Sequence, residues 1–171
     1  MIKIYFQNTE FLNYLVNNVF NMLFVQELVK DYTSLEEINV QWGEMDAMQH
    51  VNNLVYLRYF ESSRIKYFID YLKIGVSPDG LGAILAEISC KYKFPLTYPD
   101  KIISGVRPMI ETLDDYSIQM HQIVVSLKHE RIAAEGIAKI VFYDYIKGKK
   151  AIIPAHIKDA LIVSVNKDSL L

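Results

Sequence analysis

Residues 42–56, WGEMDAMQHVNNLVY, are the most informative part of the sequence. It places the carboxylate of Asp46 and the imidazole of His50 in a short loop, and the residues that follow, Asn52 and Asn53, open a segment without Pro or Gly. A helix start offers unpaired backbone N–H groups and the positive end of the helix dipole. A carboxylate beside such donors suits hydrolysis of an activated acyl group, because it can attack or activate water while the donors hold the oxyanion.

Outward from this loop, the chain predicts one strand, one long helix and then a run of strands. Residues 35–43 alternate apolar and polar side chains, and residues 54–72 have the length of about five helical turns. Turns rich in Pro, Gly and Asp separate four further strand-like segments, which are residues 84–94, 101–113, 116–129 and 132–145. Strands that follow a helix with short connections indicate an α+β fold with an antiparallel sheet.

Three finer expectations concern the packing of these elements. Pro108 interrupts its strand and predicts a bulge or a sheet edge there, and residues 151–153 predict a brief return of strand. A short helix starts at Pro154, with three residues pointing inward: Ile157, Leu161 and Ile162. Apolar residues cover most sides of the long helix, which predicts that a curled sheet surrounds it: Leu54, Leu57, Phe60, Ile65, Phe68, Ile69 and Leu72.

Composition bounds the class of protein. The 171 residues suffice for one domain, and a net charge of -2 without a basic run argues against a nucleic-acid partner. The single cysteine, Cys90, rules out an intrachain disulfide and fits the reducing cytoplasm. No Cys/His group has zinc-site spacing and no glycine-rich phosphate loop is present, so we expect neither a metal nor a bound nucleotide cofactor.

Residues 1–33 form an N-terminal extension that we predict to be helical, ahead of a main domain at residues 34–171. The charge-free stretch at residues 11–26 is short and interrupted by Asn, so we expect neither a membrane span nor a secretory signal. Three interpretations stay open: a helix that packs on the domain or a partner, a membrane-surface anchor, or an upstream extension with Met22 as the natural start. We favour the added helix, because its polar face carries almost no Lys or Arg.

Three groups of residues together resemble a known family. They are residues 46–53 followed by Tyr56, Glu61 and Arg64; residues 82–88 with Tyr92, Pro95, Leu96 and Asp100; and residues 134–138 with Ile153 and Pro154. Across residues 35–158 the chain resembles the hotdog-fold thioesterases, in particular the 4-hydroxybenzoyl-CoA thioesterase-like acyl-CoA thioesterases. The His-Val-Asn-Asn step at residues 50–53 is also similar to that of plant acyl-ACP thioesterases. Two residues depart from the pattern: Gln49 replaces a usual Gly, and Met48 replaces the Asn of the plant enzymes.

The resemblance implies an α+β hotdog fold: an antiparallel sheet of five or six strands wrapped around a long central helix, here with an added N-terminal helix. It implies a homodimer or homotetramer with active sites between subunits. The implied reaction is hydrolysis of an acyl-CoA or acyl-carrier-protein thioester without a metal, and coenzyme A enters only as part of the substrate. Asp46 takes the position of the catalytic acid, as a nucleophile that forms an anhydride or as a general base on water.

The other candidate site residues each carry two interpretations. His50 either orients Asp46 or polarises the carbonyl, or it is structural. The backbone N–H of Asn53 is the predicted oxyanion donor, while Asn52 caps the helix and adjoins the substrate. Glu61 forms a buried ion pair with Arg64, or it is itself the catalytic acid, as in another hotdog branch.

Substrate contacts are predicted more broadly. Tyr56 is a core or interface aromatic that also adjoins the substrate. Basic side chains on the strands either bind the coenzyme A phosphates or are simply solvated: Lys91 and Arg107 first, then Lys93, Lys128 and Arg131. The long helix would line the acyl tunnel, and abundant Tyr, Phe and Met favour a medium, long or aryl acyl chain, as in fatty acid metabolism.

The sequence therefore predicts a cytoplasmic acyl-CoA thioesterase. One rival is a hotdog hydratase or dehydratase, in which an Asp–His pair of different spacing acts on the β-carbon. The other rival is a non-catalytic acyl-thioester-binding protein, which the departures at Met48 and Gln49 leave open.

Overall fold

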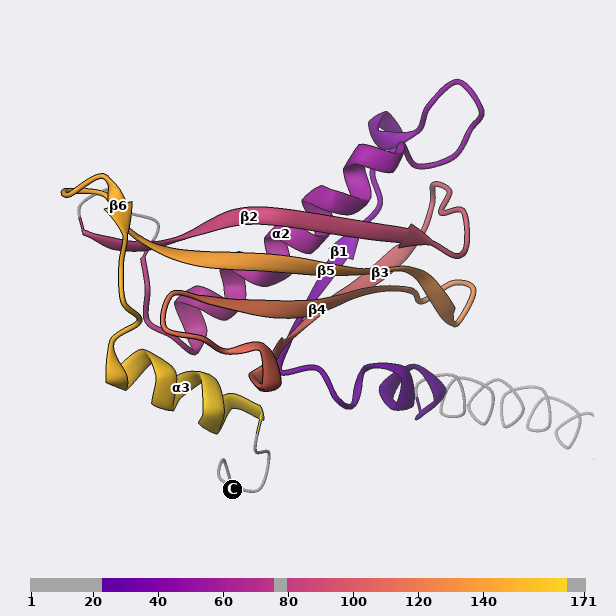
Figure 1. The fold of residues 1–171 in the computed structure, drawn as a ribbon. Coiled ribbons are helices and arrows are strands. Elements are labelled where there is room, and N and C mark those ends of the chain that lie inside the picture. Colours follow the sequence, from indigo (N-terminus) through magenta and orange to yellow (C-terminus); the bar gives the residue numbers. More distant parts are fainter. Residues whose placement is uncertain (1–22, 76–79, 166–171) are drawn as a thin grey trace, which may run out of the picture.

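The computed structural model describes residues 23–75 and 80–165 (Figure 1). The apolar positions at residues 11–20 and the alternative start at Met22 therefore lie outside the described residues. The elements in chain order are β1 (Ser34–Asn39), the 3-10 turn η1 (Trp42–Glu44), α2 (Asn53–Asp70), β2 (Leu81–Tyr92), β3 (Lys101–Met109), the 3-10 turn η2 (Ile110–Thr112), β4 (Ser117–Ser126), β5 (Arg131–Asp144), β6 (Lys149–Lys150) and α3 (Ala155–Val165).

The strands form one antiparallel sheet in the order β1-β3-β4-β5-β2, with the short β6 paired to β5. The long helix α2 crosses one face of this sheet, and α3 lies at one end (Figure 1). α2 packs mainly against β1, β3 and β4, and β2 lies at its margin, where Ile88 and Cys90 pack against the apolar cluster that contains Phe60. The α+β class, the antiparallel sheet and the long helix are as the sequence predicts.

The structure differs from the sequence prediction at the end of the first strand and at the return strand. The first strand ends at Asn39, because Gln41 and Glu44 cap each other and turn residues 42–44 into a 3-10 turn. Residues 151–153 are not strand, and the return strand is Lys149–Lys150. Pro108 lies beyond the last β1–β3 pair, at Val106, so the missing N–H of the proline costs β3 no ladder hydrogen bond to β1.

The prediction that α2 is buried on most sides is wrong. Its buried face consists mainly of aromatic and polar residues: Tyr56, Tyr59, Phe60, Ser63, Arg64 and Tyr67. Three of the predicted core positions are exposed, Leu54 at 66%, Ile69 at 47% and Ile65 at 36%. A helix covered by half a sheet can bury only one stripe, so the other stripe stays free.

Apolar clusters fill both faces of the sheet. On the inner face, one cluster packs α2 and α3 against the strands, with Ile157 and Leu161 inward and Ile162 41% exposed, contrary to prediction. On the outer face, helical residues 23–29 and Tyr32 pack on β4, where Ile123 and Val125 are fully buried. This packing agrees with an added N-terminal helix on the domain. Within the described residues no helix is long and apolar enough to cross a membrane.

Candidate active site

The loop between η1 and α2 is a tight hairpin closed by its own backbone. Met45 and Val51 form an antiparallel bridge, and the amide of Asp46 donates to the carbonyl of His50 at 2.8 Å. The amide of Gln49 donates back to the carbonyl of Asp46 at 3.0 Å, and Gln49 has φ of 61°. This left-handed position favours glycine, which accounts for the Gly expected there from the resemblance.

The Asp46 carboxylate is exposed but held in place. Its Oδ1 accepts hydrogen bonds from the amides of Met48 at 2.8 Å and His50 at 3.4 Å. Among the described residues Oδ2 has no hydrogen-bond partner, so this oxygen is free to take a water molecule or face a carbonyl carbon. The carboxylate thus has a fixed orientation and an open face, as a base or a nucleophile requires.

The start of α2 supplies the expected donor. Asn52 is the N-cap, because its side chain accepts from the amide of Leu54 at 2.9 Å and its carbonyl accepts from Val55 at 2.9 Å. Asp46 is therefore not the cap. No described group accepts from the N–H of Asn53, which leaves one orphan donor at the positive end of the helix.

Asp46, His50 and Asn53 share one pocket of about 360 Å³ at the end of α2, together with Val51, Tyr56, Tyr92, Lys93, Phe94 and Pro95. The phenol of Tyr92 donates to the carbonyl of Asn53 at 3.0 Å, which ties the end of β2 to the helix start. Sequence reasoning placed Asp46, His50 and Asn53 together but gave Tyr92 and Phe94 no role. Tyr92 belongs to the residues that carry the family resemblance, whereas the signal of Phe94 was its aromatic character at the end of a predicted strand.

The His50 side chain is exposed at the mouth of this pocket. No described side chain bonds to its ring, while its backbone holds the hairpin closed. The structural contribution of His50 comes from its backbone, and its imidazole is accessible from the Asp46 pocket.

Tyr56 is a buried residue below the pocket, with 3% of its surface exposed, and its phenol makes two hydrogen bonds to the backbone. Its phenol donates to the carbonyl of Phe94 at 3.3 Å and accepts from the amide of Leu96 at 2.8 Å. The carbonyl of Leu96 in turn accepts from the amide of Val51 at 2.8 Å. Tyr56 therefore holds the end of the Asp46 hairpin in place through Leu96. Burial raises the pKa of Tyr56, and the phenol stays protonated.

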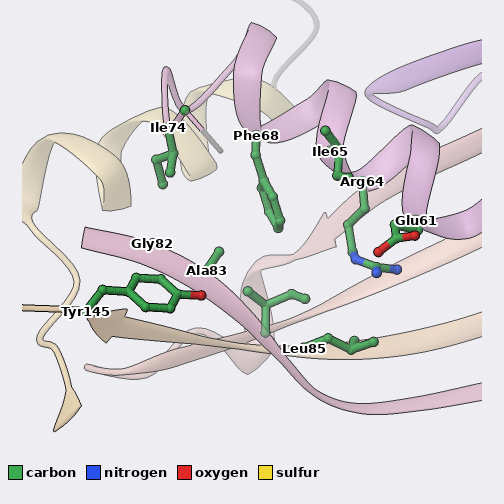
Figure 2. A pocket seen from close by; sticks show the side chains of 11 residues that line it. Glu61, Arg64, Ile65, Phe68, Ile74, Gly82, Ala83, Leu85 and Tyr145 are labelled. Carbon is green, nitrogen blue, oxygen red and sulfur yellow. The ribbon is translucent and has the colours of Figure 1, made fainter. Parts of the chain in front are cut away.

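Glu61 and Arg64 lie in a different pocket, of about 370 Å³, between α2 and β2. Figure 2 shows both side chains pointing into the space that Phe68 and Leu85 enclose. Glu61 is exposed, whereas Arg64 is 5% exposed and donates from Nη1 to Oε1 of Gln122 at 3.0 Å. The predicted buried Glu61–Arg64 ion pair is therefore wrong, and burial lowers the pKa of Arg64.

The basic candidates separate by position. Lys93 lines the Asp46 pocket but forms an ion pair with Glu135 at 2.5 Å. The Arg131 guanidinium lies 4.8 Å from the ring centre of Phe94, at the rim of that pocket. Neither Lys91 nor Arg107 is among the residues that line it, and Arg107 pairs with His121 across β3 and β4.

Across residues 23–75 and 80–165, no three His, Cys, Asp or Glu side chains gather as metal ligands. The polar groups that line the Asp46 pocket include its carboxylate, the imidazole of His50 and the ammonium of Lys93. A carboxylate can activate water, and a free backbone N–H can hold an oxyanion.

Comparison with known proteins gives one family. A family model described as the thioesterase-like superfamily matches residues 40–161. None of the curated proteins matches the chain at the sequence level.

Solved structures resemble the fold over most of the chain. A thioesterase from Thermus thermophilus, in complex with coenzyme A and Zn, is 26% identical, covers 81% of this chain and 99% of its own, and has a TM-score of 0.69. A thioesterase-superfamily protein from a Jannaschia species is 21% identical over 77% and 82% of the two chains, with a TM-score of 0.70. A 1,4-dihydroxy-2-naphthoyl-CoA thioesterase from Synechocystis is 14% identical over 75% and 95%, with a TM-score of 0.64. The last two show the fold alone.

Proposed function

The chain belongs to the thioesterase-like superfamily of thioester hydrolases with the hotdog fold, and from this premise we propose that it is an acyl-CoA thioesterase. It hydrolyses the thioester to a free acid and coenzyme A in the Asp46 pocket. One observation carries the proposal: the Asp46 carboxylate, oriented by two backbone amides, shares a pocket with the unpaired N–H of Asn53.

In the general-base form, Asp46 takes a proton from water and the resulting hydroxide adds to the thioester carbonyl. The oxyanion accepts from the Asn53 N–H, and its collapse breaks the C–S bond. The proton on Asp46 then returns to the departing thiolate. In the nucleophile form, Asp46 adds to the carbonyl itself and the C–S bond breaks, which gives an anhydride and the coenzyme A thiolate. Water then cleaves the anhydride to the free acid and the Asp46 carboxylate, and the proton released protonates the thiolate. Turnover in ¹⁸O-water separates the two forms, because label found in Asp46 by mass spectrometry requires the anhydride.

A second copy of the chain completes the site. The β2 strand is a sheet edge with one free side, and the stripe beside it is apolar and exposed at Ile65, Ile69 and Leu85. An exposed edge next to an uncovered apolar face favours association, here as a homodimer or a homotetramer. Light scattering at micromolar concentration tests this, with a monomer as the contradicting result.

The substrate contacts follow from the same pocket. Lys93 and Arg131 lie nearest to it and are the first candidates for the coenzyme A phosphates, ahead of Lys91 and Arg107. Asn52 and Tyr56 contribute through the helix cap and the loop support. The acyl chain, medium or long or aryl, runs along α2 toward the Glu61–Arg64 pocket. The single cysteine supports a location in the reducing cytoplasm. A medium or long acyl chain as substrate supports a role in fatty acid metabolism.

The test is turnover of a panel of saturated, unsaturated and aryl acyl-CoAs, with the released thiol trapped by a chromogenic disulfide. Acyl-carrier-protein thioesters and enoyl-CoAs run in parallel. We expect thiol release from the acyl-CoAs, and its loss in Asp46→Asn. Release only from the carrier protein would give the acyl-ACP thioesterase instead. Hydration without thiol release would give the hydratase, and no reaction at all would favour a binding protein.

A further inference from the structure

Glu44 lies two residues before Asp46, yet its side chain is only 11% exposed. Its Oε1 accepts from Nη2 of Arg58 at 2.7 Å. Its Oε2 accepts from the phenol of Tyr59 at 2.5 Å and from the amide of Gln41 at 2.8 Å. A carboxylate with three donors is firmly fixed, since hydrogen bonds to a charged group are among the stronger ones in proteins.

These partners join the loop to α2. Arg58 and Tyr59 lie in the second turn of the helix, whose first residue is Asn53. The carbonyl of Glu44 also accepts from the amide of Asn52, the N-cap, at 2.9 Å. One residue therefore connects the entry of the Asp46 loop, the cap of α2 and the buried face of α2.

The two side-chain partners in α2 differ in weight. The side chain of Arg58 is 61% exposed, and ion pairs in such places contribute little. Tyr59 is 2% exposed, and its buried phenol needs an acceptor. Burial, and next the hydrogen bond to Glu44, raise the pKa of Tyr59, so the phenol remains a donor. The Tyr59–Glu44 bond is the stronger half of the connection.

Asp46 itself has no such connection. Every hydrogen bond that the described residues give it comes from within the loop, from Met48, Gln49 and His50. The loop fixes the orientation of the carboxylate but not its distance from the helix start. The loop backbone is tied to the helix start by the Met45–Val51 bridge and by the bond from the Asn52 amide to the Glu44 carbonyl. Two side chains of α2 add to this: Tyr56, which holds Leu96 without a charge, and Tyr59, which holds the charged Glu44.

We propose that Glu44 is a positioning residue, which holds the Asp46 carboxylate at its working distance from the N–H of Asn53. The inference rests on the proposed function, because it assigns Glu44 a role in the same hydrolysis. Glu44 does not touch the substrate and acts through the loop. Without the Glu44 side chain the Asp46 hairpin keeps its backbone bonds and the Tyr56 connection but loses the charged bond to Tyr59, and displacements near 1 Å can cost about a hundredfold in rate.

The experiment compares four variants of the full chain by kcat, KM and thermal midpoint. Glu44→Ala removes the clamp, and Glu44→Gln keeps an acceptor for Tyr59. Arg58→Met removes the exposed partner alone. The matched control is Glu37→Ala, because Glu37 also forms an ion pair, with Lys101 at 2.7 Å, but lies in β1 away from the loop.

We expect Glu44→Ala to lower kcat by about 30- to 100-fold with KM within about threefold. Glu44→Gln restores kcat to within about fivefold, while Arg58→Met and Glu37→Ala change it by less than about twofold. A stable Glu44→Ala enzyme with normal kcat would overturn the proposal. The proposal would also be overturned if kcat and the thermal midpoint fell together in Glu44→Ala and neither recovered in Glu44→Gln. If Glu44→Ala does not fold, Tyr59→Phe replaces it, with an expected fall of about tenfold.

Failure of the proposed function is recognised separately. If the unmodified chain releases no thiol from any substrate, amide hydrogen exchange of residues 45–53 tests the positioning directly. Faster exchange there in Glu44→Ala than in Glu37→Ala supports Glu44 as the residue that holds the loop. Equal exchange in the two variants overturns it.

Discussion

The loop before α2 and the middle of α2 each carry an acidic side chain, but in different surroundings. In the loop, the acid Asp46 is exposed, held by backbone amides and close to an unpaired helix N–H. In the middle of α2, the acid Glu61 is exposed without a described partner, and the cation Arg64 is buried against the neutral amide of Gln122. The first arrangement fixes a charge where a reaction can use it, and the second uses a charge to join helix and sheet.

Because of this difference, we expect substitutions at the two places to affect different properties: the rate at one and the stability of the fold at the other. A change at the Asp46 end should alter rate and leave the fold intact, because the groups there face solvent. A change at Arg64 should alter the fold first, because its charge is desolvated and its partner is completely buried.

The largest effect is expected from Asp46→Asn. Removal of a catalytic acid or base costs about 10²- to 10⁴-fold, so we expect kcat to fall by about 10³-fold with no change in thermal midpoint. The matched variant Glu61→Gln should lower kcat by less than about fivefold, well below the cost of losing a catalytic carboxylate. Steady-state kinetics on the best acyl-CoA measure both. A larger loss in Glu61→Gln would move the catalytic acid to the middle of α2.

Arg64→Met should cost stability. It removes a hydrogen bond to a charged donor and leaves the buried Oε1 of Gln122 without a partner, at a cost of about 2–3 kcal/mol in the free energy of unfolding. Arg58→Met, which removes an exposed guanidinium from the same helix, should cost less than about 1 kcal/mol. Urea unfolding measures both, and equal costs would show that Arg64 is no structural anchor.

The sequence predicted the parts of this comparison that depend on local patterns. Alternation and helical spacing predict the strands and α2, and the Asn pair correctly predicts the cap at Asn52. Long-range contacts were beyond reach. Nothing in local spacing says that Arg64 pairs with Gln122, which lies 58 positions away, or that Tyr92 bonds to the carbonyl of Asn53.

The exposed stripe of α2 was missed for a related reason. Leu54, Ile65 and Ile69 look like core residues to any pattern analysis, because hydrophobicity says that a side chain seeks a partner but not which one. In a single chain the sheet covers only one side of α2. The remaining apolar stripe is exposed in the single chain.

A smaller effect concerns the backbone of the Asp46 loop. Gln49 adopts φ of 61°, and a non-glycine residue there carries a conformational cost, so Gln49→Gly should raise the free energy of unfolding by about 0.5–1 kcal/mol. Met48→Gly, one residue earlier without a positive φ, should lower it, because glycine only adds freedom to the unfolded chain there. Urea unfolding again measures both. A loss of stability in Gln49→Gly would mean that its side chain has a role beyond the backbone.

The smallest effect lies outside α2 and the Asp46 loop. It tests whether the stability of the fold depends on pH through a residue that is not in that loop. His121 on the outer face bonds through Nδ1 to the phenol of Tyr32 at 2.9 Å, with Arg107, Glu135 and Lys93 as its charged neighbours. Burial first, and then the nearby Arg107, lower the pKa of His121 from its ordinary value of 6.5. Between the two values the unfolded chain binds more protons than the folded one, so stability is complete above about pH 6.5 and declines as pH falls below it.

Thermal midpoints between pH 5 and 8 measure this decline, and the matched variant is His121→Phe. It keeps a ring under Tyr32 but cannot titrate, so its midpoint should fall less over the same range. The Asp46→Asn protein should follow the unmodified chain, because the Asp46 loop has no contact with His121 among the described hydrogen bonds. If instead Asp46→Asn removes the pH dependence and His121→Phe keeps it, the loop and not the outer face would control stability, and the separation of function from fold along this chain would fail.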